Sequence, residues 1–76
     1  MKAAEIKDLL RIGASVDISK LNHNYTIVEL KDFARIVDTI DESHLTISSK
    51  NLNHLELKDL ARIAKSRITI VVENNC

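Results

Sequence analysis

Glu29-Leu-Lys-Asp-Phe-Ala-Arg-Ile36 is one of three copies of an eight-residue phrase, and the others are Glu5-Ile-Lys-Asp-Leu-Leu-Arg-Ile12 and Glu56-Leu-Lys-Asp-Leu-Ala-Arg-Ile63. Glu, Lys, Asp, Arg and the final Ile are identical in all copies, and the other positions are mostly apolar. The copies begin 24 and then 27 residues apart, a spacing at which one supersecondary unit stacks on the next. We therefore expect one repeat domain, 1–76, with units of approximately 1–24, 25–51 and 52–76.

Composition restricts the class of protein. Of the 76 residues, 45% are hydrophobic and 29% are charged, which is typical of a globular domain that, at this length, has a thin core. Eleven basic residues balance eleven acidic ones along the chain, so no net field attracts nucleic acid or anionic lipid. The single cysteine, Cys76, and the lack of a long apolar run predict a cytoplasmic protein without membrane contact.

The repeated phrase has the periodicity of an amphipathic helix. At about 100° per residue, Leu30, Phe33 and Ala34 share one arc, and Lys31 and Arg35 lie on the opposite side. Each copy is therefore expected to form a helix with one buried face. The boundary signals are the capping-box pairs Thr26 with Glu29 and Asn53 with Glu56, and Gly13 as a left-handed residue after the first helix.

Short segments after each helix alternate apolar and polar residues, which predicts strands at 16–19, 45–48 and 68–72. Parallel strands joined by helices connect right-handedly. The apolar side, expected to face the helices, consists of Val16, Ile18, Leu45, Ile47, Ile68, Ile70 and Val72. The other side is polar, unlike a sheet covered on both faces. We predict an α/β fold, a two-layer right-handed α/β repeat of three helix–strand units, with a three-stranded parallel sheet in order 1-2-3 and helices on one face.

Two segments resemble leucine-rich repeats. The matching residues are Leu45-Thr-Ile47 followed by Asn51-Leu52, and Val16-Asp-Ile18 followed by Leu21-Asn22. The resemblance implies an asparagine that bonds to the turns of neighbouring coils and an open sheet face that binds protein. As a likeness of architecture, it carries no specific activity.

The charged residues of the phrase lie outward on the helices. They are Lys7, Asp8, Arg11, Lys31, Asp32, Arg35, Lys58, Asp59 and Arg62. Aspartate three residues before arginine forms a supportive surface pair, and an active site is seldom copied three times, so we favour a solvated face. The alternative is a small dimeric nucleic-acid-associated regulator that uses an arginine ladder, Arg11, Arg35 and Arg62. The neighbouring aspartates and the scarcity of aromatic residues make nucleic acid the less favoured partner.

His23 and His54 follow similar Leu-Asn sequences, and Cys76 ends the chain, so the three side chains are conceivable metal ligands. No usual ligand spacing is present, and whether they meet is open. The chain also has no glycine-rich phosphate loop or nucleophile–base pattern. We therefore expect no metal, no cofactor and no enzymatic activity.

The predicted strand at 68–72 would be the outer strand of the sheet, with unpaired backbone groups. A two-fold homodimer through this strand, or strand addition by another protein, would cover it. A monomer with a short twisted edge, or a fragment of a longer array, are the remaining alternatives. We expect a non-catalytic protein-binding or self-associating module. Its predicted site consists of Ile70, Val71 and Val72 for edge pairing, and of Thr46, Ser48, Thr69 and Glu73 on the open sheet face.

Overall fold

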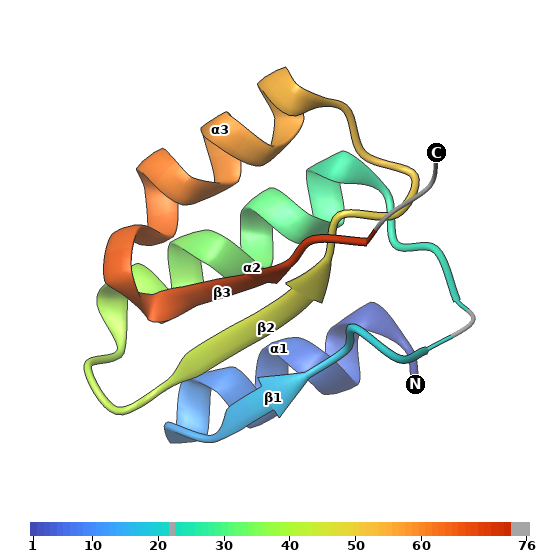
Figure 1. The fold of residues 1–76 in the computed structure, drawn as a ribbon. Helices are drawn as coiled ribbons and strands as arrows, with labels where there is room; N and C mark the ends of the chain where they lie inside the picture. The colour runs from blue at the N-terminus through green and yellow to red at the C-terminus, as the bar shows by residue number, and fades with distance from the viewer. Residues whose placement is uncertain (22, 74–76) are drawn as a thin grey trace.

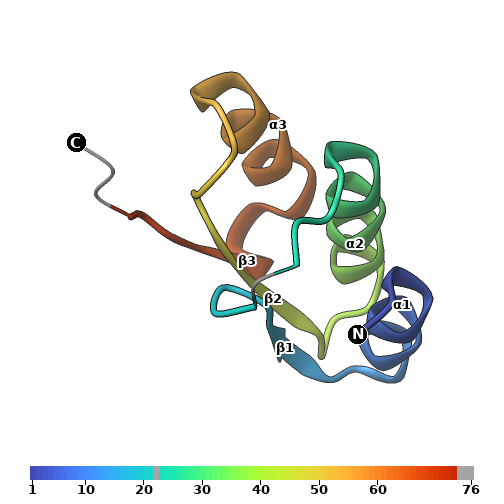
Figure 2. The same cartoon turned by 90° about the vertical axis from the view of Figure 1, so that its right-hand side faces the viewer.

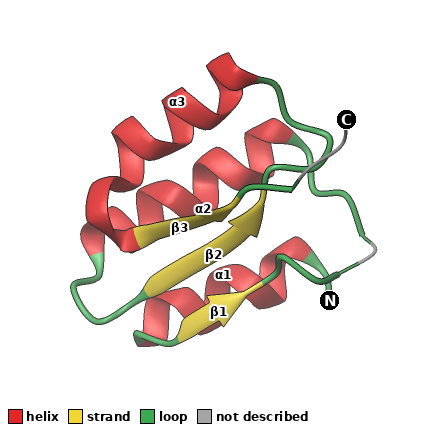
Figure 3. Cartoon of the chain, viewed as in Figure 1, coloured by secondary structure: helices red, strands yellow, loops and turns green. Residues whose placement is uncertain are grey.

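The computed structural model describes residues 1–21 and 23–73, which form an α/β fold of three helices and a three-stranded parallel sheet (Figures 1 and 3). The helices are α1 (Ala3–Ile12), α2 (Ile27–Thr39) and α3 (His54–Ala64), and a short 3-10 helix, η1 (Lys65–Arg67), follows α3. The strands are β1 (Ser15–Asp17), β2 (His44–Ser48) and β3 (Ile68–Val71). Each copy of the eight-residue phrase lies within one helix, as predicted.

The strand order is β1-β2-β3, as predicted, and both pairings are parallel. Val16 lies opposite Leu45, which in turn lies opposite Ile68, so one residue of each strand forms a row across the sheet. All three helices lie on the same side of this sheet (Figure 2). Within the described residues, the other sheet face therefore has no helix over it.

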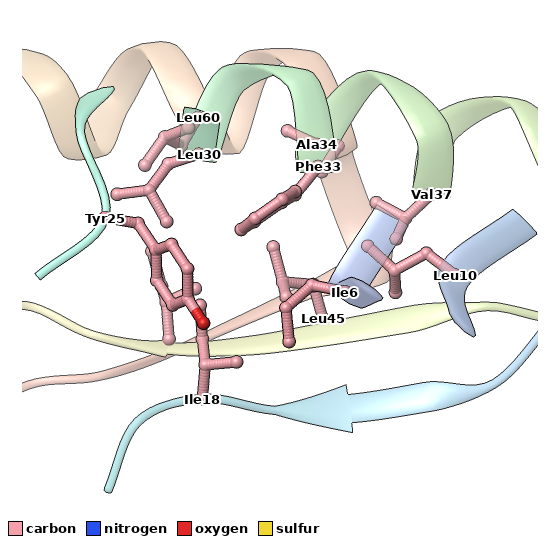
Figure 4. Packing of buried hydrophobic residues seen from close by; sticks show 12 residues of the cluster. Ile6, Leu10, Ile18, Tyr25, Leu30, Phe33, Ala34, Val37, Leu45 and Leu60 are labelled. Atoms are coloured by element: carbon pink, nitrogen blue, oxygen red, sulfur yellow. The ribbon is translucent and has the colours of Figure 1, made fainter. Parts of the chain in front are cut away.

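The core fills the space between the helices and the sheet (Figure 4). Its buried residues are Ile6, Leu10, Ile18, Tyr25, Leu30, Phe33, Ala34, Val37, Leu45, Ile47, Leu60 and Ala64. The predicted buried arc of α2 is confirmed, because Leu30, Phe33 and Ala34 are buried and Arg35 is exposed. The rings of Phe33 and Tyr25 meet edge to face with centroids 5.4 Å apart. Burying a side chain the size of Phe33 contributes about 1.5–3 kcal/mol.

The predicted capping boxes are confirmed. Thr26 Oγ1 accepts a hydrogen bond from Glu29 N at 3.2 Å, and the Glu29 carboxylate accepts one from Thr26 N at 2.8 Å. Asn53 and Glu56 make the same reciprocal bonds at 2.8 and 2.9 Å. At α1, the carboxylate of Glu5 accepts the amide of residue 2 at 2.8 Å. The identical glutamate of the three copies therefore closes the first turn of each helix.

The predicted extent of the first strand is wrong. β1 ends at Asp17 because this carboxylate accepts hydrogen bonds from the hydroxyl and the backbone N of Ser19, at 2.6 and 2.9 Å, which turns the chain. The hydrogen bond from the Ser19 hydroxyl lowers the pKa of the Asp17 carboxyl most, and the bond from Ser19 N lowers it further. β2 begins at His44, one residue earlier than predicted.

The third strand is one residue shorter than predicted. β2 ends at Ser48, so Val72 has no strand residue beside it, and Glu73 N donates instead to the side-chain hydroxyl of Ser49 at 2.9 Å. The prediction that Val72 faces the helices is wrong, since its side chain is 81% exposed. The length of β3 is thus limited by the length of its neighbour.

Gly13 ends α1 in the predicted left-handed conformation, with φ +104°. A Cβ there would lie 3.1 Å from the Cβ of Glu42. We expect Gly13→Ala to lower the free energy of unfolding by about 1–2 kcal/mol in urea denaturation. Gly13→Asn brings the same Cβ but tolerates this conformation better, so its loss should be smaller. Equal losses would show that the contact with Glu42 dominates over backbone strain.

Lys65 joins α3 to η1 with φ 57° and ψ −124°, a region that favours glycine. Its Nζ lies 3.6 Å from Asp38 Oδ1, but this pair is exposed and contributes little. Lys65→Gly should therefore raise the free energy of unfolding by about 1 kcal/mol. Lys65→Ala is the control, because it removes the ion pair and keeps the Cβ. A gain in the alanine variant as large as in the glycine variant would contradict backbone strain as the cause.

Candidate protein-binding surface

The helix-free sheet face carries the side chains that alternate with the core residues of the strands. They are Ser15, Asp17, His44, Thr46, Ser48, Thr69 and Val71. Three predicted site residues lie here, of which Thr69 is exposed and Thr46 and Ser48 are half-exposed. Thr46 lies opposite Thr69 in the register. The structure therefore brings these three residues onto one surface.

Sequence reasoning missed His44, which belongs to the same sheet face. Its Nε2 lies 2.7 Å from Thr69 Oγ1, a hydrogen bond between β2 and β3. His44 belongs to this face because β2 begins at His44 and not at Leu45. Its alternation with the buried Leu45 is the sequence signal that could have predicted this position. The fourth predicted residue, Glu73, lies beyond β3 and is exposed.

The outer edge of β3 presents backbone N–H and C=O groups to which another strand could bind. Within the described residues, β3 pairs only with β2. Val71 O accepts a hydrogen bond from Ser49 N at 2.9 Å, so the backbone groups of Val71 point toward β2. Neighbouring residues of a strand direct these groups to opposite sides, so those of Ile70 and Val72 point outward. Of the three predicted edge residues, Ile70 and Val72 thus supply backbone, and Val71 supplies a side chain that is 41% exposed.

A hollow of about 70 Å³ lies at the carboxyl ends of the strands. On its wall, the rings of His23 and Tyr25 meet edge to face at 4.5 Å, and Asn51 Nδ2 donates a hydrogen bond to Asn24 Oδ1 at 2.9 Å. Pockets that bind small molecules measure roughly 300–1,000 Å³, so this hollow suits a few waters and not a substrate.

Ion pairs cover the outer face of the helices. The predicted intrahelical pairs form, with N to O distances of 3.5 Å for Asp8–Arg11, 3.1 Å for Asp32–Arg35 and 3.7 Å for Asp59–Arg62. Two pairs that were not predicted join neighbouring α-helices, Lys7 to Asp32 at 3.3 Å and Lys31 to Asp59 at 3.7 Å. Because an aspartate lies beside each residue of the arginine ladder, the attraction of that ladder for a polyanion is weakened.

The candidate metal ligands do not occupy equivalent positions. Asn53 caps α3 as Thr26 caps α2, so His54 is the first residue of α3, whereas His23 lies three residues before the cap of α2. Cys76 lies outside the described residues. In the remainder of the chain, no group of three or more His, Cys, Asp and Glu side chains is placed to hold a metal ion.

Comparison of the chain with protein-family models, with curated proteins and with solved structures finds no match. Across residues 1–21 and 23–73, no helix combines the length and the hydrophobicity that crossing a bilayer requires. The surfaces described above are therefore the grounds for a functional proposal.

Burial raises the pKa of the Tyr25 hydroxyl, and the nearby charges of Glu29 and Glu5 raise it further. Its O–H donates a hydrogen bond to Met1 O at 2.6 Å. Because the pKa is higher in the folded state, this stabilisation is complete below the ordinary value of about 10 and is lost as pH rises through the folded pKa. From about pH 9 to about pH 12, the free energy of unfolding should fall more for the native chain than for Tyr25→Phe. Parallel pH profiles would refute this assignment.

Proposed function

We propose that this chain is a small non-catalytic protein-binding module in which a strand of a partner adds to the outer edge of β3. The observation that carries the proposal is the outward direction of the backbone groups of Ile70 and Val72. In strand addition, main-chain hydrogen bonds supply affinity and side-chain contacts supply specificity. Exposed strand edges are usually covered or blocked, and here the nearest charged residues along the chain are Arg67, just before β3, and Glu73, two residues after it.

In this proposal the partner also contacts the helix-free sheet face. Val71 provides the apolar contact, and the hydroxyls of Thr46, Ser48 and Thr69 donate and accept hydrogen bonds. Glu73 adds the one charged group of the predicted site. We further propose that the units form a right-handed repeat similar to leucine-rich repeats, in which the sheet face is the binding surface.

Strand addition is tested by photo-crosslinking in cells that express the protein. A photoreactive residue at position 71 should give covalent protein adducts, identified by mass spectrometry. Val72→Pro removes an outward N–H without removing a β2–β3 hydrogen bond, because Val72 lies beyond β3. We expect this variant to lower the adduct yield about fivefold, the effect of one hydrogen bond of about 1 kcal/mol.

The matched control places the photoreactive residue at Val28. This side chain is also apolar and exposed, but it lies on α2, away from the sheet. Adducts at position 28 should be few and insensitive to Val72→Pro. Equal yields at positions 28 and 71, or an unchanged yield at position 71 in the proline variant, would rule out strand addition at β3.

A further inference from the structure

The two ends of the helix layer each carry one half of the ionic contact that joins the helices. Lys7 of α1 pairs with Asp32 of α2, and Lys31 of α2 pairs with Asp59 of α3. In both pairs between copies of the phrase, the lysine belongs to the earlier helix and the aspartate to the later one. Among residues 1–21 and 23–73, the aspartate of the first copy of the phrase, Asp8, pairs only with Arg11 of its own helix, and the lysine of the last copy, Lys58, forms no ion pair.

Apolar side chains lie next to these charges on each helix. They are covered where another helix lies beside them and more exposed at the two ends of the helix layer. The final isoleucine of the phrase lies four residues after the aspartate, and therefore on the same side of the helix. Ile36 and Ile63 are half-buried against the core, whereas Ile12 of α1 is 82% exposed. On the lysine side, three residues after the lysine, Ala34 is fully buried and Ala61 of α3 is half-exposed.

The sheet edges complement each other in the same way. Ile18 N donates a hydrogen bond to β2 at 2.9 Å, so by alternation the backbone groups of Ser15 and Asp17 point away from β2. The outward groups of β3 are those of Ile68 and Ile70. In β1 and β2, the residues opposite them in the register direct their backbone groups to the next strand of the sheet. The backbone groups on the outer edge of β3 are therefore spaced so that a parallel β1 strand could pair with them.

We infer that the partner at β3 is a second copy of this chain, stacked head to tail, so that its α1–β1 end lies on the α3–β3 end of the first. This inference rests on the proposed function and names the occupant of the strand edge. Lys58 would pair with Asp8 of the second copy, and Ala61 would receive its Ile12. Ile68 would lie opposite its Val16, which extends the row of Val16, Leu45 and Ile68 across the sheet.

Complementarity favours this arrangement over a two-fold dimer. Two-fold pairing of β3 strands sets the α3 face, with Lys58, against the same face of the other copy, and like charges repel. It also leaves Ile12 and the edge of β1 exposed. Head-to-tail stacking pairs opposite charges. It covers both ends of each inner copy and leaves exposed only one end of the first copy and one end of the last. Such heterologous contacts leave a free end on each side of the assembly unless a ring closes, so copies continue to add beyond the dimer as the concentration rises.

Sedimentation velocity over a range of concentrations tests the inference. The native chain should grow beyond a dimer as concentration rises. Ile12→Asp disables the α1–β1 end and Ala61→Arg disables the α3–β3 end, so each variant alone should associate at least about tenfold more weakly. An equimolar mixture of the two should form a dimer and stop, because each variant retains one intact end. Val28→Asp, which places the same charge at an exposed apolar position outside both ends, should behave as the native chain.

A charge exchange gives a second test at exposed positions. Asp8→Lys and Lys58→Asp should each weaken association, and the double variant should recover it, because opposite charges again meet between copies. Circular dichroism verifies that every variant is folded.

Two results would overturn the inference. One is a native chain that stays monomeric at every concentration. The other is a dimer that does not grow and that Ile12→Asp leaves unchanged, which indicates two-fold pairing. If the native chain is monomeric but position 71 still yields adducts with another protein, the proposed function stands and only this inference fails. If these adducts are absent as well, both fail.

Discussion

The packing of α2 between α1 and α3, above β2, is the interaction on which the rest of the structure depends. Its residues Leu30, Phe33, Ala34 and Val37 are all buried, and each of the other described helices contributes fewer buried side chains to the core. Within the described residues, only α2 and β2 have a neighbouring helix and a neighbouring strand, respectively, on both sides. The outer helices and strands have such a neighbour on one side only. The properties of the two ends, including the exposed Ile12 and the outward edge of β3, follow from this difference.

Local signals predicted the helices well. The buried arc of α2 and the caps at Thr26 and Asn53 depend on residues within one or two turns of each other, so the sequence contains all the information they need. The ends of the strands depend on more distant residues. β3 stops at Val71 because β2 has already ended, and β1 stops because the carboxylate of Asp17 bonds to Ser19. Neither effect follows from the alternation of apolar and polar residues.

The candidate surface was also predictable only in part, because some of its features are local in sequence and others depend on neighbouring strands. Alternation identifies which side chains share a face, and Thr46, Ser48 and Thr69 do lie together. It does not identify which backbone groups point to a free edge, because this depends on hydrogen bonds to the neighbouring strand. The separate roles of Ile70 and Val71 therefore required the structure. The ion pairs between helices also required it, since the distance from Lys7 to Asp32 is fixed only when the helices are placed.

All three helices run in the same direction, because each is followed by a strand of one parallel sheet (Figure 1). Parallel helices have aligned dipoles, and aligned dipoles side by side repel one another. The capping carboxylates of Glu5, Glu29 and Glu56 place negative charge at the positive pole of each helix and reduce this repulsion. The chain has no net charge, yet three of its carboxylates lie together at the amino-terminal ends of the helices, where they offset the positive poles. The repeated glutamate thus has two effects. It closes the first turn of its helix, and it reduces the repulsion between neighbouring helices that run in the same direction.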